Sequence, residues 1–409
     1  MKRYLSIVIA VVAVAILAVL ILYFWKSFSL QNIAPKPSGG QTGSLPAATG
    51  GGSQGASTGN GQAGGTATGT TGNAGTPATG AVAGSFGPLA NDPILEYLPT
   101  ASGSALVIET NGIIGQVSGG KVSVISSSTA SDVVGGSFSA TGKKALIAFG
   151  NPSAPQTDLF DVATAKWTPL TQKMLSPSWS PTDNRVAYLT AASTGTEQLS
   201  IMDASTGKTS QLLALHANDL ALQWVSSGKF ALADRPSFLD AGSITMFDNA
   251  QGTLSPVVTE TPGAEALWSG ATGLLFAATQ SGQGGSLRLV NASGSTLEAL
   301  NLATLPSKCA FAQANTASGT STVSYLALYC GIPRDAAAWN SASLPDDYNE
   351  RALFTSDDIY RINTATGAID VLWSDPSQHV DVSDMKVAGT EIYFIDRYTK
   401  KLYGFAVQP

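Results

Sequence analysis

The cysteines and histidines of the chain are too few for most metal and nucleophile chemistry. There are two of each, Cys309, Cys330, His216 and His379, which excludes a Cys/His zinc module. A catalytic triad needs a base within hydrogen-bond reach of a nucleophile, and no serine or aspartate is tied by spacing to either histidine. We therefore predict no catalytic residue, no metal site and no cofactor, and interpret both histidines as ordinary loop residues.

The two cysteines flank a segment with the pattern of a β-hairpin. Their residue numbers centre this hairpin between Gly319 and Thr320, inside a turn-like Ala-Ser-Gly-Thr sequence. Simple hairpin geometry places Cys309 and Cys330 opposite one another on neighbouring strands. In an oxidising compartment we expect a structural disulfide, and two buried free thiols are the alternative.

Residues 331–356 mix aromatic and charged side chains in a way that is typical of protein interfaces. Trp, Tyr and Arg dominate binding hot spots. The candidate binding residues in this segment are Arg334, Trp339, Asp346, Asp347, Tyr348 and Arg351. The alternative is that the segment folds back to plug a channel or to cover a sheet edge.

A second set of candidates consists of carboxylates in short segments that precede apolar strands. If the fold brings these segments to one face, the carboxylates form an acidic ring that holds a cation or a basic partner segment. The alternative is that they are scattered, solvated acids. The residues are Asp132, Asp219, Glu260, Glu265, Asp381 and Asp384, with Lys308 as a basic exception.

The fold that must position these residues is indicated by a repeat of about 43 residues. An aromatic or large apolar residue, a short polar turn and an apolar strand recur with anchors at Tyr97, Phe138, Trp179, Trp224, Trp268, Phe311 and Met385. A second turn signature begins near Gln116, Asp161, Asp203, Asp248, Asn291 and Asn363 and keeps the same period. Each unit contains four short strands and no helical periodicity, so we predict an all-β, seven-bladed β-propeller with four-stranded blades.

The third unit carries a resemblance to a known family. Its sequence SPSWSPTDNRVAYLT, followed by LSIMDASTGK, resembles the repeat of TolB-type propellers, which share the four-stranded blade of WD-repeat proteins. The resemblance covers roughly residues 92–409 and implies the fold. It implies little about function, because the motif residues are turn and core positions.

The seventh unit ends without room for a fourth strand. We predict that a segment between about Ala83 and Leu95 supplies this outer strand and closes the ring through both ends of the propeller. In this fold the 331–356 insertion joins the second and third strands of the sixth blade. It therefore opens onto the same face as the inter-blade segments.

The N-terminal region has the pattern of a membrane anchor. Residues 4–25 contain no charged side chain and are long enough to span a bilayer, and Lys2 and Arg3 precede them. We predict a cytoplasmic stub (1–3), a transmembrane signal-anchor helix (4–25), a disordered Gly/Ser/Thr/Ala/Pro-rich stalk (26–88) and an extracytoplasmic propeller (89–409). A cleaved signal peptide is the rival interpretation.

Charge is distributed unevenly between these parts. All 28 acidic residues follow residue 91, together with 18 of the 22 basic ones, so the propeller carries a formal charge of −10. Only 12% of all residues are charged, which excludes the basic surface of a nucleic-acid binder. The sequence thus predicts a membrane-anchored module that binds a protein or peptide at the cell envelope. The alternative is an envelope hydrolase or lyase that uses carboxylates on the channel face.

Overall fold

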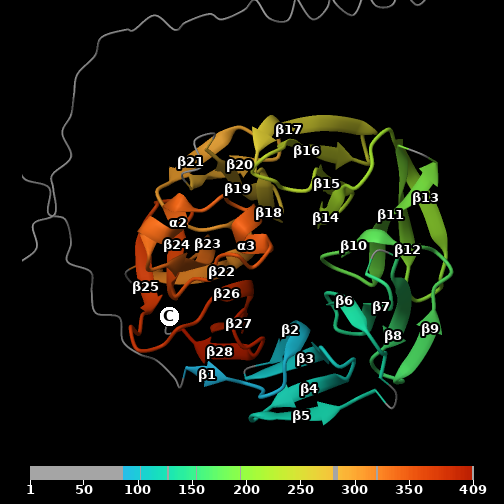
Figure 1. The fold of residues 1–409 in the computed structure, drawn as a ribbon, viewed down its shortest axis with the longest axis horizontal. Coiled ribbons are helices and arrows are strands. Elements are labelled where there is room, and N and C mark those ends of the chain that lie inside the picture. Colours follow the sequence, from blue (N-terminus) through green and yellow to red (C-terminus); the bar gives the residue numbers. More distant parts are fainter. Residues whose placement is uncertain are drawn as a thin grey trace, which may run out of the picture. The chain divides into compact units, whose positions relative to one another are not determined.

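A computed structural model describes residues 86–407 except 102, 127–128, 153, 194, 280–283 and 319–320. The described residues form seven antiparallel four-stranded sheets. Figure 1 shows these sheets arranged as blades around a central channel, with the first strand of each blade nearest the channel. The predicted seven-bladed propeller is therefore confirmed.

Each blade runs outward from the channel in chain order, except that the seventh takes its outer strand from the N-terminal side of the propeller. Blades 1 to 4 comprise β2 (Ile94–Ala101), β3 (Ser104–Glu109), β4 (Ile114–Ser118) and β5 (Lys121–Val124); β6 (Val133–Phe138), β7 (Lys144–Phe149), β8 (Gln156–Asp161) and β9 (Lys166–Pro169); β10 (Leu175–Trp179), β11 (Arg185–Ser193), β12 (Thr196–Asp203) and β13 (Thr209–Leu215); and β14 (Ala221–Ser226), β15 (Lys229–Ala233), β16 (Ala241–Asp248) and β17 (Thr253–Pro262).

Blades 5 to 7 include the insertion and the closing strand. They comprise β18 (Glu265–Ser269), β19 (Thr272–Ala278), β20 (Gly285–Asn291) and β21 (Thr296–Leu300); β22 (Cys309–Ser318), β23 (Ser321–Pro333), β24 (Asp357–Asn363) and β25 (Ile369–Trp373); and β26 (Val382–Ala388), β27 (Glu391–Asp396), β28 (Leu402–Ala406) and the closing strand β1 (Gly87–Pro88). A short 3₁₀ helix, η1 (Pro306–Lys308), leads into β22.

The recurring turn signature has a hydrogen-bond explanation. At the end of the third strand in blades 2 to 6, an Asp or Asn side-chain oxygen accepts backbone N–H groups of the following turn. This local bonding pattern ends the strand and reverses the chain, which is why the signature keeps the period of the blade. The residues are Asp161, Asp203, Asp248, Asn291 and Asn363.

The hydrophobic core is divided among the interfaces between blades. Seven clusters of buried side chains are found in the described residues, and each joins two neighbouring blades. One example is the cluster between blades 7 and 1, where Tyr393 and Ile395 pack with Tyr97 and Val107. An apolar sheet face that would be exposed in an isolated blade is thereby buried against the neighbouring blade.

The ring is closed by the predicted N-terminal segment. Gly87 pairs with Gly404 and Pro88 with Tyr403, and the Leu89 N–H donates to the Leu402 carbonyl at 2.7 Å. The Phe86 ring stacks on Trp373, with ring centroids 3.9 Å apart. A Cβ atom on Gly404 would lie 2.6 Å from a Leu89 methyl carbon, so glycine is needed for this close approach.

The hairpin of β22 and β23 confirms the predicted cysteine pairing. Ser318 pairs with Ser321 at the tip, and Cys309 lies opposite Cys330, to which it is joined by a disulfide bond. Their Cα atoms are 4.1 Å apart. The disulfide fixes the base of the longest hairpin of the propeller, next to the start of the insertion.

The predicted anchor (4–25) and most of the predicted stalk (26–88) lie outside the described residues. The described part of the chain contains no helix with the length and apolar character needed to cross a bilayer. Gly87 and Pro88, the last two residues of the predicted stalk, form β1 and belong to the propeller.

The closing segment gives the first testable prediction. A chain beginning at Asp92 lacks Phe86, Leu89 and β1, whereas a chain beginning at Ala83 keeps them. Phe86 and Leu89 are partly buried against the core. Because full burial of a Phe or Leu side chain contributes about 1.5–3 kcal/mol, we expect the shorter chain to lose about 2 kcal/mol or more of unfolding free energy. Urea denaturation and the thermal midpoint measure this difference. Equal stability of the two chains would show that β1 does not close the ring.

Candidate functional site

The insertion of blade 6 folds back onto the propeller. It contains two short helices, α2 (Ala336–Ser341) and α3 (Asp346–Asn349). Trp339 and Tyr348 are only 1% and 3% exposed, and their rings pack edge to face, with centroids 6.0 Å apart. Both residues join the apolar cluster between blades 5 and 6. These two predicted binding residues are thus core residues that hold the insertion in place, and neither presents a surface to a partner.

Three other predicted binding residues are engaged within the chain. Arg334 pairs with Asp358 at 2.6 Å and donates to the Gln378 carbonyl. Asp346 accepts from the Phe238 N–H at 2.9 Å, which ties α3 to blade 4. Asp347 accepts from the Ser343 N–H within the insertion. Arg351 is exposed and has a positive φ of 63°.

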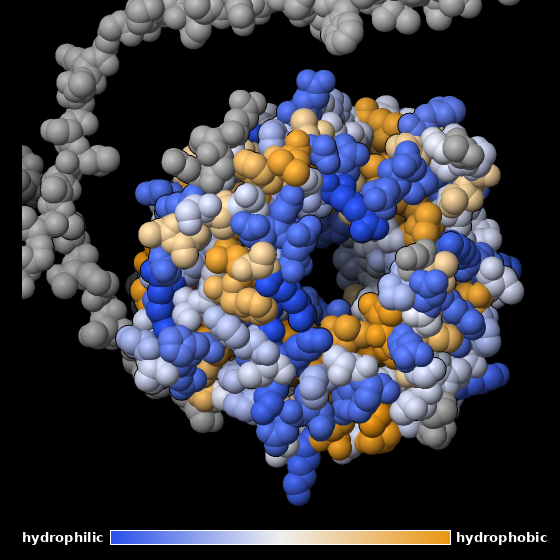
Figure 2. Space-filling view, viewed as in Figure 1, coloured by the Kyte–Doolittle hydropathy of each residue, from blue (hydrophilic) through white to orange (hydrophobic). Residues whose placement is uncertain are grey.

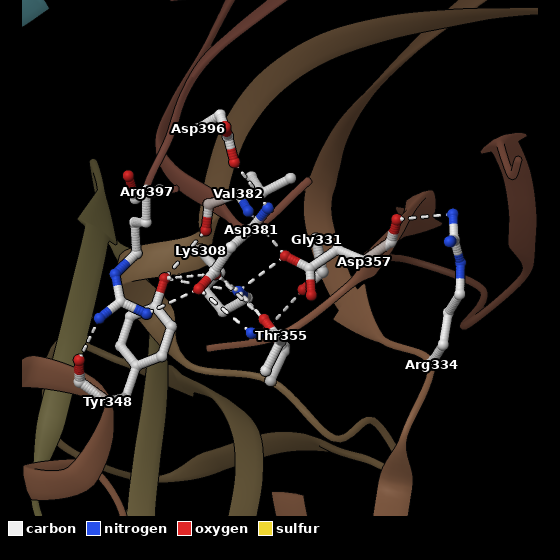
Figure 3. A network of polar contacts seen from close by, with 12 residues as sticks. Lys308, Gly331, Arg334, Tyr348, Thr355, Asp357, Asp381, Val382, Asp396 and Arg397 are labelled. Carbon is white, nitrogen blue, oxygen red and sulfur yellow. Dashed lines mark hydrogen bonds and ion pairs between the residues drawn. The ribbon is translucent and has the colours of Figure 1, made fainter. Parts of the chain in front are cut away.

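A buried network of charges lies beneath the insertion (Figure 3). The Lys308 ammonium contacts Asp357 and Asp381, each at 2.7 Å, and all three side chains are fully buried. It also donates to the Thr355 hydroxyl at 2.9 Å. Arg397 bonds the second oxygen of Asp381 at 2.8 Å. We call Lys308, Thr355, Asp357, Asp381 and Arg397 the buried ion network.

The buried ion network connects the insertion to blades 6 and 7. Arg397 comes from the end of β27 in blade 7, and its guanidinium donates to the Tyr348 carbonyl and lies 3.7 Å from the centre of the Tyr348 ring. The Tyr348 hydroxyl in turn donates to the Val382 carbonyl at 3.0 Å. Removal of Lys308 would leave the buried Asp357 carboxylate without its cation.

Burial and pairing act in opposite directions on these groups. Burial alone lowers the pKa of Lys308, but the carboxylates of Asp357 and Asp381 outweigh it and raise that pKa, so the ammonium stays charged. Burial raises the pKa of Asp357, although Lys308 partly compensates. One oxygen of Asp357 has no hydrogen-bond partner in the described part of the chain. The network therefore depends on Lys308.

Asp381 was expected at an acidic channel mouth, and the structure places it in the buried ion network instead. Asp132 is exposed, and Asp219 is exposed and paired with Arg235. Glu265 accepts from the Ser307 N–H at 2.8 Å. Asp384 lines a cavity in the channel wall. Because Asp381 is buried and Asp219 and Glu265 are engaged elsewhere, the predicted acids do not form one ring.

This cavity, of about 440 Å³, lies in the channel wall between the inner strands of blades 5, 6 and 7. Lys386 joins Asp384 in lining it and also pairs with Glu96 of blade 1. Burial and the nearby Asp384 outweigh Lys386 and raise the pKa of Glu96 to about 7. Sequence reasoning missed Glu96 and Lys386, because they lie 290 residues apart and carry no motif.

A second hollow, of about 360 Å³, runs beside the insertion and is called the aromatic groove here. Phe354 and Tyr398 are 38% and 48% exposed and stack with centroids 5.1 Å apart. The Ser356 hydroxyl lies 2.8 Å from His379 Nδ1, a contact that the sequence spacing did not indicate. The groove is lined by Pro333, Phe354, Ser356, Pro376, His379 and Tyr398, among others.

Figure 2 shows how these features relate to the molecular surface. The central opening is visible, so the insertion does not fill it. Hydrophilic side chains cover much of its rim, and apolar side chains gather in a patch over the insertion. The sequence left two alternatives for the insertion, a binding surface or a segment that folds back over the propeller. In the structure the insertion folds back over the blades, and a groove runs along its edge.

The buried ion network gives the second prediction. Lys308→Met leaves Asp357 and Asp381 without their shared cation, and loss of one partner of a buried pair costs about 3–5 kcal/mol. We expect a loss of unfolding free energy of this size in urea denaturation. The loss should be smaller at pH 5 than at pH 8, because protonation relieves buried carboxylates whose pKa is raised.

The matched control is Arg235→Met, which removes a cation from the exposed pair with Asp219. Exposed pairs contribute about 1 kcal/mol or less, so this variant should be close to the parent in stability. If Lys308→Met were as stable as Arg235→Met, the network would not hold the insertion.

Comparison with known proteins finds only distant structural similarity. No protein family and no curated protein matches the chain by sequence. Among solved structures, the β-propeller domain of the Trilobed protease from Pyrococcus furiosus is 12% identical, with 64% of this chain and 76% of that chain covered and a TM-score of 0.41. Virginiamycin B lyase from Staphylococcus aureus is 11% identical (78% and 96% covered, TM-score 0.48). Oligogalacturonate lyase from Vibrio parahaemolyticus is 12% identical (78% and 90% covered, TM-score 0.49). The chain is similar to these propellers in fold.

Proposed function

We propose that the protein is a membrane-anchored, extracytoplasmic propeller that binds a protein or peptide at the cell envelope through the aromatic groove. The observation that carries this proposal is the exposed, stacked pair of Phe354 and Tyr398 in a hollow of about 360 Å³. Rigid aromatic rings in a concave site are the side chains that most often dominate peptide recognition.

The charges around the aromatic groove favour an uncharged ligand. The Arg334 guanidinium is occupied by Asp358 and by two backbone carbonyls. The Asp335 carboxylate accepts from the Ala338 N–H and caps α2. What remains for a ligand is the aromatic pair, two prolines and the Ser356–His379 pair. This surface suits an extended apolar segment, such as one that carries proline or an aromatic residue.

The rigidity of the groove supports the same function. Arg397 lies 5.0 Å from the centre of the Phe354 ring and is held by the buried ion network. Thr355, which lines the groove, accepts from Lys308 and donates to Asp381. The aromatic pair is therefore supported from below, so little side-chain entropy remains to be lost on binding.

The predicted location comes from the sequence. The uncharged residues 4–25, with Lys2 and Arg3 before them, favour an anchor with a cytoplasmic N-terminus. The disulfide is consistent with an oxidising compartment.

The third prediction tests the aromatic groove. The full chain and its Phe354→Ala and Tyr398→Ala variants are crosslinked in an envelope fraction, and overlapping peptides of the captured partner are titrated by fluorescence anisotropy. We expect each variant to weaken peptide binding about tenfold or more, which is about 1.4 kcal/mol. Tyr398→Phe keeps the ring and should bind within about threefold of the parent.

The control is Leu254→Ala, which truncates a side chain of similar exposure on β17, away from the groove. Thermal midpoints establish that all variants are folded. Equal binding by the parent and both alanine variants, or no captured partner at all, would rule out the groove as the binding surface.

A second candidate function, that of an envelope hydrolase or lyase, is favoured by Glu96. A carboxyl with a pKa raised to about 7 beside Asp384 is the pattern of a general acid or base. The fourth prediction is that any turnover found in a glycan and peptide substrate screen falls about 100-fold or more in Glu96→Gln, with binding in the groove retained. Turnover that persists in Glu96→Gln would exclude this carboxyl as the acid or base.

A further inference from the structure

The cavity in the channel wall combines apolar walls with a polar rim. Leu267, Pro306, Phe311 and Met385 supply apolar surface, and Asp384 and Lys386 supply charge. These residues come from three consecutive blades, 5, 6 and 7. It is separate from the aromatic groove and shares no lining residue with it.

The lysine at this rim has no hydrogen to offer a ligand. A Lys ammonium carries three donors. In the structure they go to a Glu96 oxygen, to the Tyr97 carbonyl at 2.7 Å and to an Asp384 oxygen at 3.1 Å. The ammonium also lies 4.3 Å from the centre of the Tyr97 ring. An anion entering the cavity would therefore find a positive charge that is already fully bonded.

The carboxylates, by contrast, retain acceptor capacity. Asp384 is 40% exposed at its side chain, and one ammonium is shared between Asp384 and Glu96, so the ionised cluster has an excess of one negative charge. Glu265 lies two residues before Leu267 of the cavity wall, and burial raises the pKa of its carboxyl. One of its oxygens accepts from the N–H of Ser307, which lines the cavity, and the other is buried without a hydrogen-bond partner in the described part of the chain.

We propose that this cavity binds an ammonium or guanidinium group carried on a short alkyl chain. The alkyl part would pack against Leu267, Pro306, Phe311 and Met385, and the cation would neutralise the excess charge of Glu96 and Asp384. Two sources share this chemistry, the side chain of a lysine or arginine in a partner protein and a free polyamine.

The backbone at Asp384 provides a clean way to test this proposal. Asp384 has a positive φ of 48°, which Asn tolerates better than other non-glycine residues. Asp384→Asn therefore removes the charge and keeps the backbone. Asp132 precedes the inner strand of blade 2, also has a positive φ, of 54°, and is exposed. Asp132→Asn is thus a control with the same change of charge in the same backbone conformation.

The fifth prediction concerns binding of two cationic probes to the full chain by isothermal titration calorimetry. The probes are N-acetyl-arginine amide and spermidine, and N-acetyl-norleucine amide is the uncharged control. We expect saturable one-to-one binding of at least one cation, weakened about tenfold or more in Asp384→Asn and unchanged in Asp132→Asn. Binding of only the arginine amide identifies a partner side chain as the ligand, and binding of only spermidine identifies a free polyamine.

Three results would overturn the proposal. They are no saturable binding of either cation, equal binding by the parent and Asp384→Asn, and equal binding of the norleucine amide and the arginine amide. Phe354→Ala should bind the cations like the parent, so failure here is distinguishable from failure of the aromatic groove.

The pH dependence of cation binding provides a second readout. The titratable groups around Glu96 are Asp384 and Lys386 from β26 and Tyr97 from β2. Because the pKa of Glu96 is raised to about 7, this carboxyl gains a proton and loses its charge as the pH falls below 7. A bound cation favours the charged form, so affinity should rise between pH 6 and pH 8 in the parent and change less in Glu96→Gln.

Discussion

Every blade of this propeller depends on its two neighbours for burial of its apolar side chains. The described core consists of clusters between adjacent sheets, and none of these clusters lies within a single sheet. Blade 7 is complete only because β1 joins β28, and Phe86, just before β1, stacks on Trp373 of blade 6. Closure of the ring is therefore the constraint on which the channel and the packing of blade 1 against blade 7 depend.

Charged groups at the interfaces between blades add specificity to this packing. The buried ion network joins the insertion to blades 6 and 7, and the contact of Glu96 with Lys386 joins blade 1 to blade 7. The first network is dry and balanced around Lys308, so it suits a structural role. The second opens onto the channel with an excess of negative charge and a carboxyl that titrates near neutral pH, so it suits ligand binding.

The sequence predicted the architecture well because the repeat records local interactions. The Asp and Asn turn residues bond backbone groups two to four positions away, and the apolar strands between them are short. Both patterns are therefore visible in the sequence. The closing strand and the disulfide could be predicted by counting, since one blade lacked a strand and the two cysteines were equidistant from a turn.

The candidate sites were harder to predict because their residues meet only in the folded ring. Trp339 and Tyr348 belong to residue types that are enriched both in interfaces and in cores, so composition could not decide between these roles. Like the exposed Asp132, Asp381 directly precedes an inner strand, and its burial follows from contacts with Lys308 and Arg397 that form only in the fold. Lys308 was the useful signal, as a basic residue among the acids of the inter-blade segments.

The closing strand also determines the order in which the protein can fold. Gly87 and its partner Gly404 are 317 residues apart, so β1 emerges early during synthesis while its partner is among the last strands to be made. Until β28 is complete, blade 1 lacks a neighbour on one side and the apolar faces of Tyr97 and Val107 stay uncovered. A chain interrupted anywhere before blade 7 is thus an open arc with two exposed apolar ends, which is the form most prone to associate with other copies. Pairing of β28 with β1 turns that arc into a closed ring.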